Sequence, residues 1–227
     1  GACHPATEGL RRRRGPCAAG KNVPVRRQFS GHILGVGSTS GTRVVVGRWL
    51  SSPFGSFADV MIEHADGHRR LLAPTSQVAD FVAQTYTFDE VEVTPVEVQV
   101  VGDLWRVRAA PLHLTATIGQ RTALGWLLRG IPRPIASSTA WASMVDPVAR
   151  VALRGVRTRG TARVGRREWY AATDVRAVTR LIGRLDGQDL GHLADVDPPC
   201  RFGFSSTPRR PSVTQAVTTV KVNAALD

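Results

Sequence analysis

The chain has 227 residues, with 28 arginines against 2 lysines and a net charge of +12 at pH 7. This length suits one domain or two small ones, and a core of that size needs no disulfides. Three cysteines do not make a disulfide framework or a metal site, no apolar run approaches the roughly 20 residues of a membrane span, and no apolar stretch follows the basic N-terminus as in a secretory signal. These features favour a reduced, cytoplasmic location.

The positive charge is distributed unevenly along the chain. Residues 1–28 carry +6, residues 29–100 carry −4, residues 101–184 carry +11 and residues 185–227 carry −1. A GC-rich genome explains arginine in place of lysine, but it does not explain the surplus of positive charge. The surplus indicates an acidic partner such as nucleic acid, or acidic and basic segments that pair within one fold.

The first part of the chain predicts a tail followed by hairpins. Residues 1–28 are basic and lack periodicity, which indicates a disordered tail before a single α+β domain at 29–227. Strands are expected at 30–37 and 42–49, and again at 57–64 and 68–73. A two-residue turn at Asp66-Gly67 would place Ile62 opposite Leu71. Apolar residues on both faces indicate that the strand at 57–64 is covered on both sides.

A helix and a second hairpin follow. Helical spacing of apolar residues predicts a helix at 75–86, capped by Thr75 or Ser76. Residues 90–101 alternate again, with a phase slip at Pro95 that indicates a bulge or an edge position. A turn at Gly102-Asp103 then sets Val98 opposite Val107 and Glu97 opposite Arg108, with one apolar and one charged face.

The second half predicts short helices and closing strands. Helices are expected at 122–129, at 138–145 and from Asp146, and a hairpin is expected at 156–164 and 167–173. Residues 175–185 suit either a helix or a strand, and residues 200–204 and 212–222 are expected to be closing strands. The predicted fold is therefore α+β, with a mainly antiparallel sheet, barrel- or sandwich-like, and a few short helices. Such folds often bind a small ligand in the concavity of the sheet or at the barrel mouth.

Motifs for common cofactors and for metals are not convincing. Gly15 to Lys21 matches most of a phosphate-binding loop, but Asn22 replaces the metal-binding hydroxyl and no strand precedes it. His64 and His68 would project from opposite faces of the Asp66-Gly67 hairpin, so we expect no metal site. Asp189 and His192 could form an acid–base pair, but their surroundings are typical of a loop. The prediction is no cofactor and no identifiable nucleophile.

One strand carries a row of arginines. Alternation places Arg157, Arg159 and Arg163 on one face of the 156–170 hairpin, and the Gly165-Arg166 turn would bring Tyr170 opposite Thr161 and Glu168 opposite Arg163. Like charges in a row must be solvated, paired with acids, or used to bind an anion. Glu90, Glu92 and Glu97 are the candidate acids.

Two functional hypotheses follow from these observations. The first is a cytoplasmic domain that binds an anionic small molecule through Arg157, Arg159, Arg163 and Tyr170, with or without catalysis. The alternative is a nucleic-acid-binding protein that contacts phosphates through the tail and the 101–184 segment, although no recognition helix or stacking platform is apparent.

Overall fold

The computed structural model describes residues 25–132, 135, 159–163, 166–203 and 207–222. The elements within these ranges are β1 (Val25–Ser38), β2 (Arg43–Ser51), β3 (Phe57–Glu63), β4 (Arg69–Ala73), α1 (Ser76–Thr85), β5 (Glu90–Val93), β6 (Glu97–Val101), β7 (Leu104–Ala109), β8 (Leu112–Arg121), α2 (Ala123–Arg129), β9 (Arg159–Arg163), β10 (Arg166–Leu185), β11 (Gln188–Asp189), β12 (Leu193–Ala194) and β13 (Ser212–Val222). The helices predicted at 138–145 and from Asp146 lie outside the described residues, as do residues 1–24. Residues 25–28, predicted as tail, begin β1.

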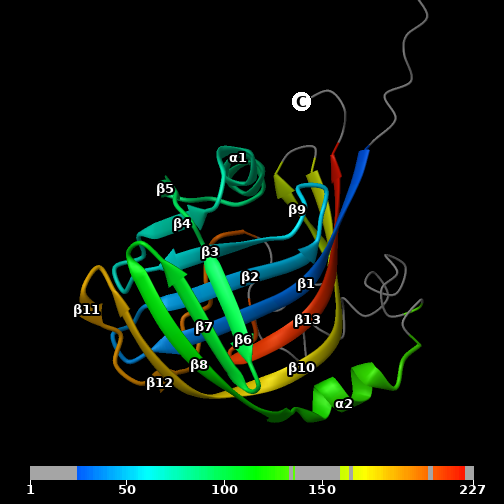
Figure 1. Cartoon of the computed structure of the whole chain (residues 1–227). Coiled ribbons are helices and arrows are strands. Elements are labelled where there is room, and N and C mark those ends of the chain that lie inside the picture. Colours follow the sequence, from blue (N-terminus) through cyan, green and yellow to red (C-terminus); the bar gives the residue numbers. More distant parts are fainter. Residues whose placement is uncertain (1–24, 133–134, 136–158, 164–165, 204–206, 223–227) are drawn as a thin grey trace, which may run out of the picture.

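The strands form one sheet that curls round on itself. Its main path runs β5-β4-β3-β2-β1-β13-β10-β8-β7-β6, with β9 and β11 paired to β10 and β12 paired to β1. The two edge strands, β5 and β6, are separated in the chain only by residues 94–96, so the two edges of the sheet must lie close together. Figure 1 shows the result, a half-barrel in which β6, β7 and β8 wrap in front of β1, β2 and β3.

The sheet is mixed rather than purely antiparallel. β4 pairs with β5 in parallel, because the chain crosses from one to the other through α1. Parallel neighbours require such a crossover, and the crossover helix then covers one face of the sheet. The helix begins as predicted: the Thr75 hydroxyl accepts a hydrogen bond from the Val78 amide at 3.3 Å. Val78, Phe81, Val82 and Thr85 are buried, which confirms the predicted helical face.

Alternation along β2 and β3 separates two apolar layers. Val44, Val46, Val60 and Ile62 face the interior of the half-barrel, where they pack with residues of β7 and β8 such as Leu114. The intervening residues of the same strands point to the opposite face, beneath α1. The prediction that the strand at 57–64 is covered on both sides is confirmed, and each face of this part of the sheet has its own core.

Two hairpins contrast in how well the turn residues predict the register. At Gly102-Asp103 the predicted pairs are present, with Val98 opposite Val107 and Glu97 opposite Arg108. At Asp66-Gly67 the predicted register is wrong by one residue, since Ile62 pairs with Arg70 and Leu71 with Met61. The loop contains three residues instead of two: the His64 amide bonds the His68 carbonyl at 2.9 Å, and Gly67 takes the positive φ of 91° that ends such a loop.

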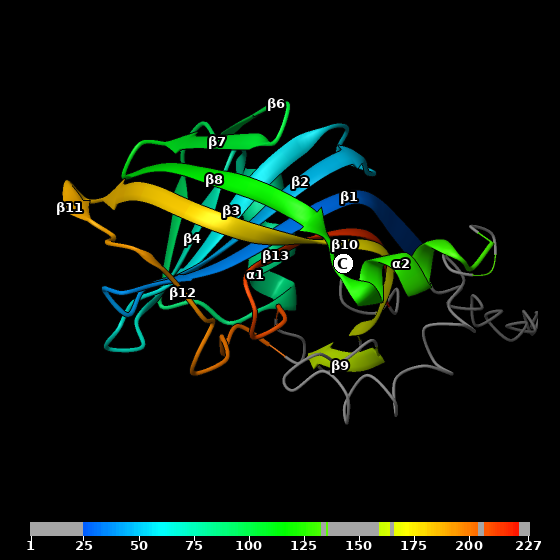
Figure 2. The same cartoon turned by 90° about the horizontal axis from the view of Figure 1, so that it is seen from below.

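The second half of the chain departs further from the predicted elements. β10 continues unbroken through 175–185, so the ambiguous segment is strand, and Figure 2 shows β10 extending between β11 at one end and β9 at the other. The strand predicted at 212–222 is confirmed as β13, but it lies between β1 and β10 in the middle of the sheet path. Residues 200–203 are not strand, and β8, which the predicted elements omit, alternates buried and less buried residues along its length.

The predicted hairpin at 156–173 exists with a different register. In the described part Arg166 pairs with Arg163, Arg167 with Thr161, and Trp169 with Arg159. The predicted pairs of Glu168 with Arg163 and of Tyr170 with Thr161 are therefore wrong. A register shift between residues 166 and 167 accounts for part of the difference, since a bulge changes which residues face each other.

Candidate functional site

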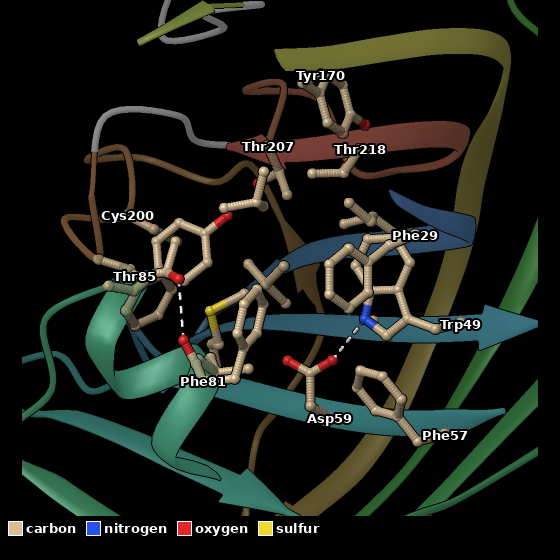
Figure 3. A pocket seen from close by; sticks show the side chains of 18 residues that line it. Phe29, Trp49, Phe57, Asp59, Phe81, Thr85, Tyr170, Cys200, Thr207 and Thr218 are labelled. Carbon is tan, nitrogen blue, oxygen red and sulfur yellow. Dashed lines mark hydrogen bonds between the residues drawn. The ribbon is translucent and has the colours of Figure 1, made fainter. Parts of the chain in front are cut away.

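An apolar cavity of about 90 Å³ lies between α1 and the sheet, on the face opposite the half-barrel interior. Figure 3 shows its lining from close by. The lining comes from β1, β2, β3, β10, β13, α1 and the segment before β13: Phe29, Ile33, Val45, Gly47, Trp49, Phe57, Asp59, Met61, Phe81, Val82, Thr85, Tyr86, Tyr170, Cys200, Phe202, Thr207, Thr218 and Val220. This cavity lies outside the concavity of the sheet, so the expectation of a ligand in the concavity or at the barrel mouth stays a prediction.

One carboxyl group lies within this apolar lining. Asp59 is in the middle of β3, directly across from Gly47 of β2, and its side chain is 2% exposed. Its Oδ1 accepts a hydrogen bond of 2.8 Å from Trp49 Nε1. Its other oxygen is directed into the cavity (Figure 3) and has no hydrogen bond to any described residue. The cavity therefore offers one hydrogen-bonding position on an otherwise apolar wall.

A glycine makes room for this carboxyl group. A Cβ atom on Gly47 would lie 2.4 Å from Asp59 Oδ1 and 2.6 Å from Trp49 Nε1, so any larger residue would collide with the hydrogen bond itself. Gly47 and Trp49 alternate onto the same face of β2, which brings the indole N–H diagonally opposite Asp59. The pairing of β2 with β3 thus assembles the three residues.

Burial changes the protonation of Asp59. Removal from water raises the pKa of its carboxyl group to about 7, and the hydrogen bond from Trp49 only partly opposes this rise. A carboxyl group with a pKa near neutral pH can either accept or donate a hydrogen bond under ordinary conditions. Groups with strongly shifted pKa values gather at functional sites, although structural causes also exist.

Aromatic rings surround the carboxyl group. Phe29 stacks on Phe81 with ring centroids 5.1 Å apart and meets Trp49 edge-on at 5.7 Å. Phe57 lies within 6.4 Å of both Phe29 and Trp49. Figure 3 shows Asp59 between Phe81 on one side and Trp49 with Phe57 on the other. These ring contacts hold the walls of the cavity in place, since each aromatic pair adds about 0.5–1.5 kcal/mol beyond its buried area.

Hydroxyl groups line the other end of the cavity. Tyr170, Thr207 and Thr218 lie there (Figure 3), and Tyr170 and Thr218 are direct partners across β10 and β13. The Oγ1 atoms of Thr207 and Thr218 are buried and have no hydrogen-bond partner among the described residues. Thr85, in contrast, donates to the Phe81 carbonyl at 2.9 Å. Buried hydroxyls normally find partners, so Thr207 and Thr218 are suited to meet a polar group inside the cavity.

The segment that carries Cys200 and Phe202 is hydrogen-bonded to Glu63, a member of a buried ion pair in the sheet. Glu63 is fully buried on β3, pairs with Arg43 at 3.2 Å, and accepts a hydrogen bond of 2.6 Å from the Arg201 amide. The adjacent Cys200 is also buried, and its desolvation raises the pKa of the thiol to about 12. This thiol is therefore protonated at neutral pH and is not an activated nucleophile.

The predicted arginine site is only partly placed. Arg157 lies outside the described residues, and Arg159 and Arg163 are in β9, of which the backbone alone is described. Tyr170 is half-buried and lines the cavity. Figure 1 shows β9 close to α1, the helix that contributes Phe81, Val82 and Thr85 to the cavity. The structure thus associates Tyr170 with the cavity and leaves the role of the arginines as a prediction.

Two of the candidate acids are already engaged with another arginine. Glu90 and Glu92 of β5 both pair with Arg70 of β4, and Asp186 joins them. Their partnership follows from the parallel pairing of β4 with β5, which sets Arg70 directly beside Glu90. They are therefore not reserved for the row at 157–163.

Two pairs of side chains were considered as candidate sites, His64 with His68 and Asp189 with His192, and the first differs from the prediction. The prediction that His64 and His68 project from opposite faces is wrong, because they form the last pair of the β3–β4 hairpin and their rings lie 5.9 Å apart. Within the described residues no group of three ligating side chains surrounds them. Asp189 Oδ1 accepts a hydrogen bond of 2.6 Å from the Gly191 amide, as in an ordinary turn.

The predicted site omitted the residues at the centre of the cavity, Asp59, Trp49 and Gly47. A signal was present in the sequence: Asp59 lies among the apolar residues Phe57, Ala58, Val60, Met61 and Ile62 of a strand predicted to be covered on both faces. A carboxyl group in such a strand must be buried and needs a hydrogen-bond donor. The sequence does not indicate which donor this is, because no turn signal sets the register between 42–49 and 57–64.

Comparisons with known proteins give only distant similarities of fold. No protein-family model matches the chain, and no curated protein matches it significantly. The crystal structure of acetoacetate decarboxylase from Legionella pneumophila aligns with a TM-score of 0.39 and 8% identity, covering 97% of this chain and 96% of that chain. Another acetoacetate decarboxylase structure aligns with a TM-score of 0.36 and 9% identity, over 87% of this chain and 85% of that one.

A third structure is similar over a smaller part of its own length. This is a protein described as a putative AttH from Nitrosomonas europaea, with a TM-score of 0.25 and 12% identity. The alignment covers 88% of this chain and 39% of that chain. Similarities this weak concern the path of the chain, so the function must be inferred from the cavity itself.

Proposed function

We propose that this chain is a small-molecule-binding domain that holds a compact, largely apolar ligand in the cavity beneath α1. The observation that carries the proposal is Asp59, a carboxyl group 2% exposed whose second oxygen faces the cavity and has no hydrogen bond to a described residue. A buried polar group without a partner costs about 1–3 kcal/mol, and a ligand that hydrogen-bonds it recovers that cost. Apolar walls with a few placed polar groups are typical of ligand sites.

The size of the cavity restricts the ligand. A volume of about 90 Å³ is smaller than the roughly 300–1,000 Å³ of sites for drug-sized molecules. It is large enough for more than a single water molecule, which needs about 10–15 Å³ on a comparable measure. The ligand, or the part of it that enters, therefore has few heavy atoms.

The test measures thermal unfolding with small neutral probes, namely toluene, cyclohexanol and indole. A ligand at ten times its Kd stabilises the native state by about 1.4 kcal/mol, which raises Tm by about 3–6 °C for a chain of this size. We expect this rise for at least one probe in the wild type. Val45→Phe, which fills the cavity, should abolish it, while Leu50→Phe at an exposed position of the same strand should preserve it.

A second readout protects the test against a misfolded variant. The indole N–H resonance of Trp49 should shift when a probe binds to the wild type, because its hydrogen-bond acceptor lines the cavity. If none of the probes changes either Tm or this resonance in the wild type, the cavity is not a ligand site for such molecules and the proposal is wrong.

The anionic character of the ligand is a further part of the proposal. Arg157, Arg159 and Arg163 carry it, together with Tyr170, which connects their hairpin to the cavity. A ligand with its apolar part in the cavity and an acidic group near β9 would combine both predictions. Catalysis and a cytoplasmic location stay predictions, and within the described residues no helix is long and apolar enough to cross a membrane.

The nucleic-acid alternative receives no support from the described part of the chain. Arg121 and Arg176 of the basic 101–184 segment form ion pairs with acids of the same segment. Arg121 bonds Asp174 through two hydrogen bonds of 2.7 and 2.9 Å and lies over the ring of Trp126, and Arg176 pairs with Asp103 at 3.2 Å. Both acids belong to the 101–184 segment itself, so these pairs offset part of its positive charge and do not join it to the acidic 29–100 segment.

A further inference from the structure

The described lining of the cavity contains a carboxyl group and no basic side chain, and this indicates the charge of the ligand group that binds there. Resting on the proposed function, we propose that the Asp59 end of the cavity recognises a compact organic ammonium group, with the cationic nitrogen near the free Asp59 oxygen and its alkyl groups against the surrounding rings. Two independent features lead to this class: a buried carboxyl group without a counter-charge, and an aromatic enclosure around it. Together with an acidic group near β9, such a ligand would be a zwitterion.

The carboxyl group has no positive partner within the cavity. The described lining contains no arginine, lysine or histidine. The neighbouring Arg43 is 4% exposed and is engaged with Glu63 further along the same face of β3. Arg27 lies over the rings of Phe54 and Phe81, at 5.7 and 5.5 Å from their centroids. Among the described residues, the one donor to Asp59 is the neutral indole of Trp49. A buried carboxyl group without a counter-charge either keeps its proton or pairs with a cation, and a bound ammonium group would supply that cation.

The rings around Asp59 suit a cation as well as an apolar group. Phe29, Trp49, Phe57 and Phe81 contribute ring surfaces on several sides of the carboxyl group. Aromatic faces attract ammonium groups by about 2 kcal/mol or more when water is excluded, and aromatic enclosures are the usual receptors for quaternary ammonium. A neutral ligand would gain only the apolar contact, whereas an ammonium ion gains the rings and the carboxylate together.

Arginine already shows that these rings accept a cation. The guanidinium of Arg27 lies over the ring of Phe81, 5.5 Å from its centroid, and the same residue lines the cavity. The small volume of the cavity limits the part of the ligand that enters to a compact head group such as trimethylammonium. The hydroxyls of Thr207 and Thr218, without partners among the described residues, are available to a polar group carried by the same ligand.

Binding of a cation is expected to depend on pH. Burial raises the pKa of Asp59 to about 7 because its negative charge is uncompensated, and a bound ammonium ion would lower it again. The other titratable groups of the lining are Tyr86, Tyr170 and Cys200, and desolvation keeps the Cys200 thiol protonated. Below pH 7 the ligand must displace a proton from Asp59, so its affinity should fall by up to about ten-fold per pH unit.

The experiment compares two probes of the same shape by calorimetry: choline, and 3,3-dimethylbutan-1-ol, in which carbon replaces the charged nitrogen. At pH 8 we expect choline to bind the wild type at least about ten-fold more tightly, a difference of about 1.4 kcal/mol. Asp59→Asn should remove this preference and leave the affinity of the alcohol nearly unchanged. Asp80→Asn, an exposed carboxylate on α1, is the matched control and should keep the preference.

The outcomes separate this inference from the proposed function. If both probes bind with equal affinity, or the alcohol binds more tightly, the cavity is a ligand site but does not select ammonium, and the inference is wrong. If neither these probes nor the neutral panel binds, the proposed function fails as well. Retention of alcohol binding by Asp59→Asn shows that the variant cavity is intact, so a loss of choline binding cannot then be attributed to misfolding.

Discussion

Asp59 is the residue at which stability and function are in conflict. Ionisation of a carboxyl group in an apolar cavity destabilises the folded state. The same group is the only carboxylate of the cavity lining within the described residues. Gly47 supports this arrangement at a further cost in conformational entropy, since glycine is unfavourable inside a strand. Positions that break a local rule in this way are often functional.

The pH dependence of folding should report this conflict. The folded pKa of Asp59 is raised to about 7 from 3.8, so the unfolded chain loses this proton at lower pH than the folded chain. The corresponding stability is fully present below about pH 3.8 and is lost as the pH rises to about 7, with a slope of about 1.4 kcal/mol per pH unit. We expect the free energy of unfolding of Asp59→Asn, measured in urea, to lack this slope.

The difference in free energy of unfolding between the wild type and Asp59→Asn separates the effect of Asp59 from that of other titrating groups. Burial lowers the pKa of His32, which acts in the opposite direction below its usual pKa of 6.5, but it contributes equally to the wild type and the variant. Asp80→Asn controls for the loss of an exposed charge. Parallel stability curves for the wild type and Asp59→Asn between pH 5 and 7 would contradict the assignment.

At the scale of elements, α1 is both a connection and a cover. It joins the parallel strands β4 and β5, and its buried face supplies Phe81, Val82 and Thr85 to the cavity. Its start depends on Thr75, whose hydroxyl caps the Val78 amide. The apolar spacing of 75–86 and the hydroxyl before it predicted the element correctly, because both signals are local.

Loss of the cap should weaken the cover as well as the helix. We expect Thr75→Ala to lower the free energy of unfolding by about 1 kcal/mol, since one amide of the first turn loses its acceptor. Thr75→Ser retains a capping hydroxyl and should restore most of the stability. Urea unfolding of the three proteins measures the effect, and equal midpoints would show that the cap contributes nothing.

At the scale of the whole molecule, the two faces of the curled sheet differ in how they are packed. The interior of the half-barrel is filled by side chains, whereas the opposite face of β1–β3 and β13 leaves a cavity beneath α1. Many charged groups are paired with one another. Arg70 forms ion pairs with Glu90, Glu92 and Asp186, and Arg121 and Arg176 each pair with an aspartate. The net charge of the chain is therefore a poor guide to its ligand.

The arginines of β9 provide the test of the anionic part of the proposal. We expect Arg159→Ala with Arg163→Ala to reduce the affinity for inorganic phosphate, measured by calorimetry, at least about ten-fold, since an arginine fork on an anion is a strong contact. Tm should stay nearly unchanged. The control is Arg106→Ala with Arg108→Ala, which removes the same charge from exposed positions of β7.

Three results would contradict this prediction. A wild type that does not bind phosphate would exclude the anion site for this probe. An equal loss of affinity in both double variants would show that net charge, rather than a site on β9, governs binding. A large fall in Tm of the β9 variant would show that Arg159 and Arg163 are structural.

The sequence by itself determined the features that depend on neighbouring residues: the Gly102-Asp103 register, the capped helix at 75–86, the strand covered on both faces, and a curled sheet with few helices. Tertiary structure decided the rest. The cavity requires Gly47 opposite Asp59 and Tyr170 opposite Thr218, and these pairs join strands whose register no local turn specifies. The parallel β4–β5 pair and the central place of β13 likewise arise from packing between distant segments, because strand partners are chosen by buried surface rather than by adjacency in the chain.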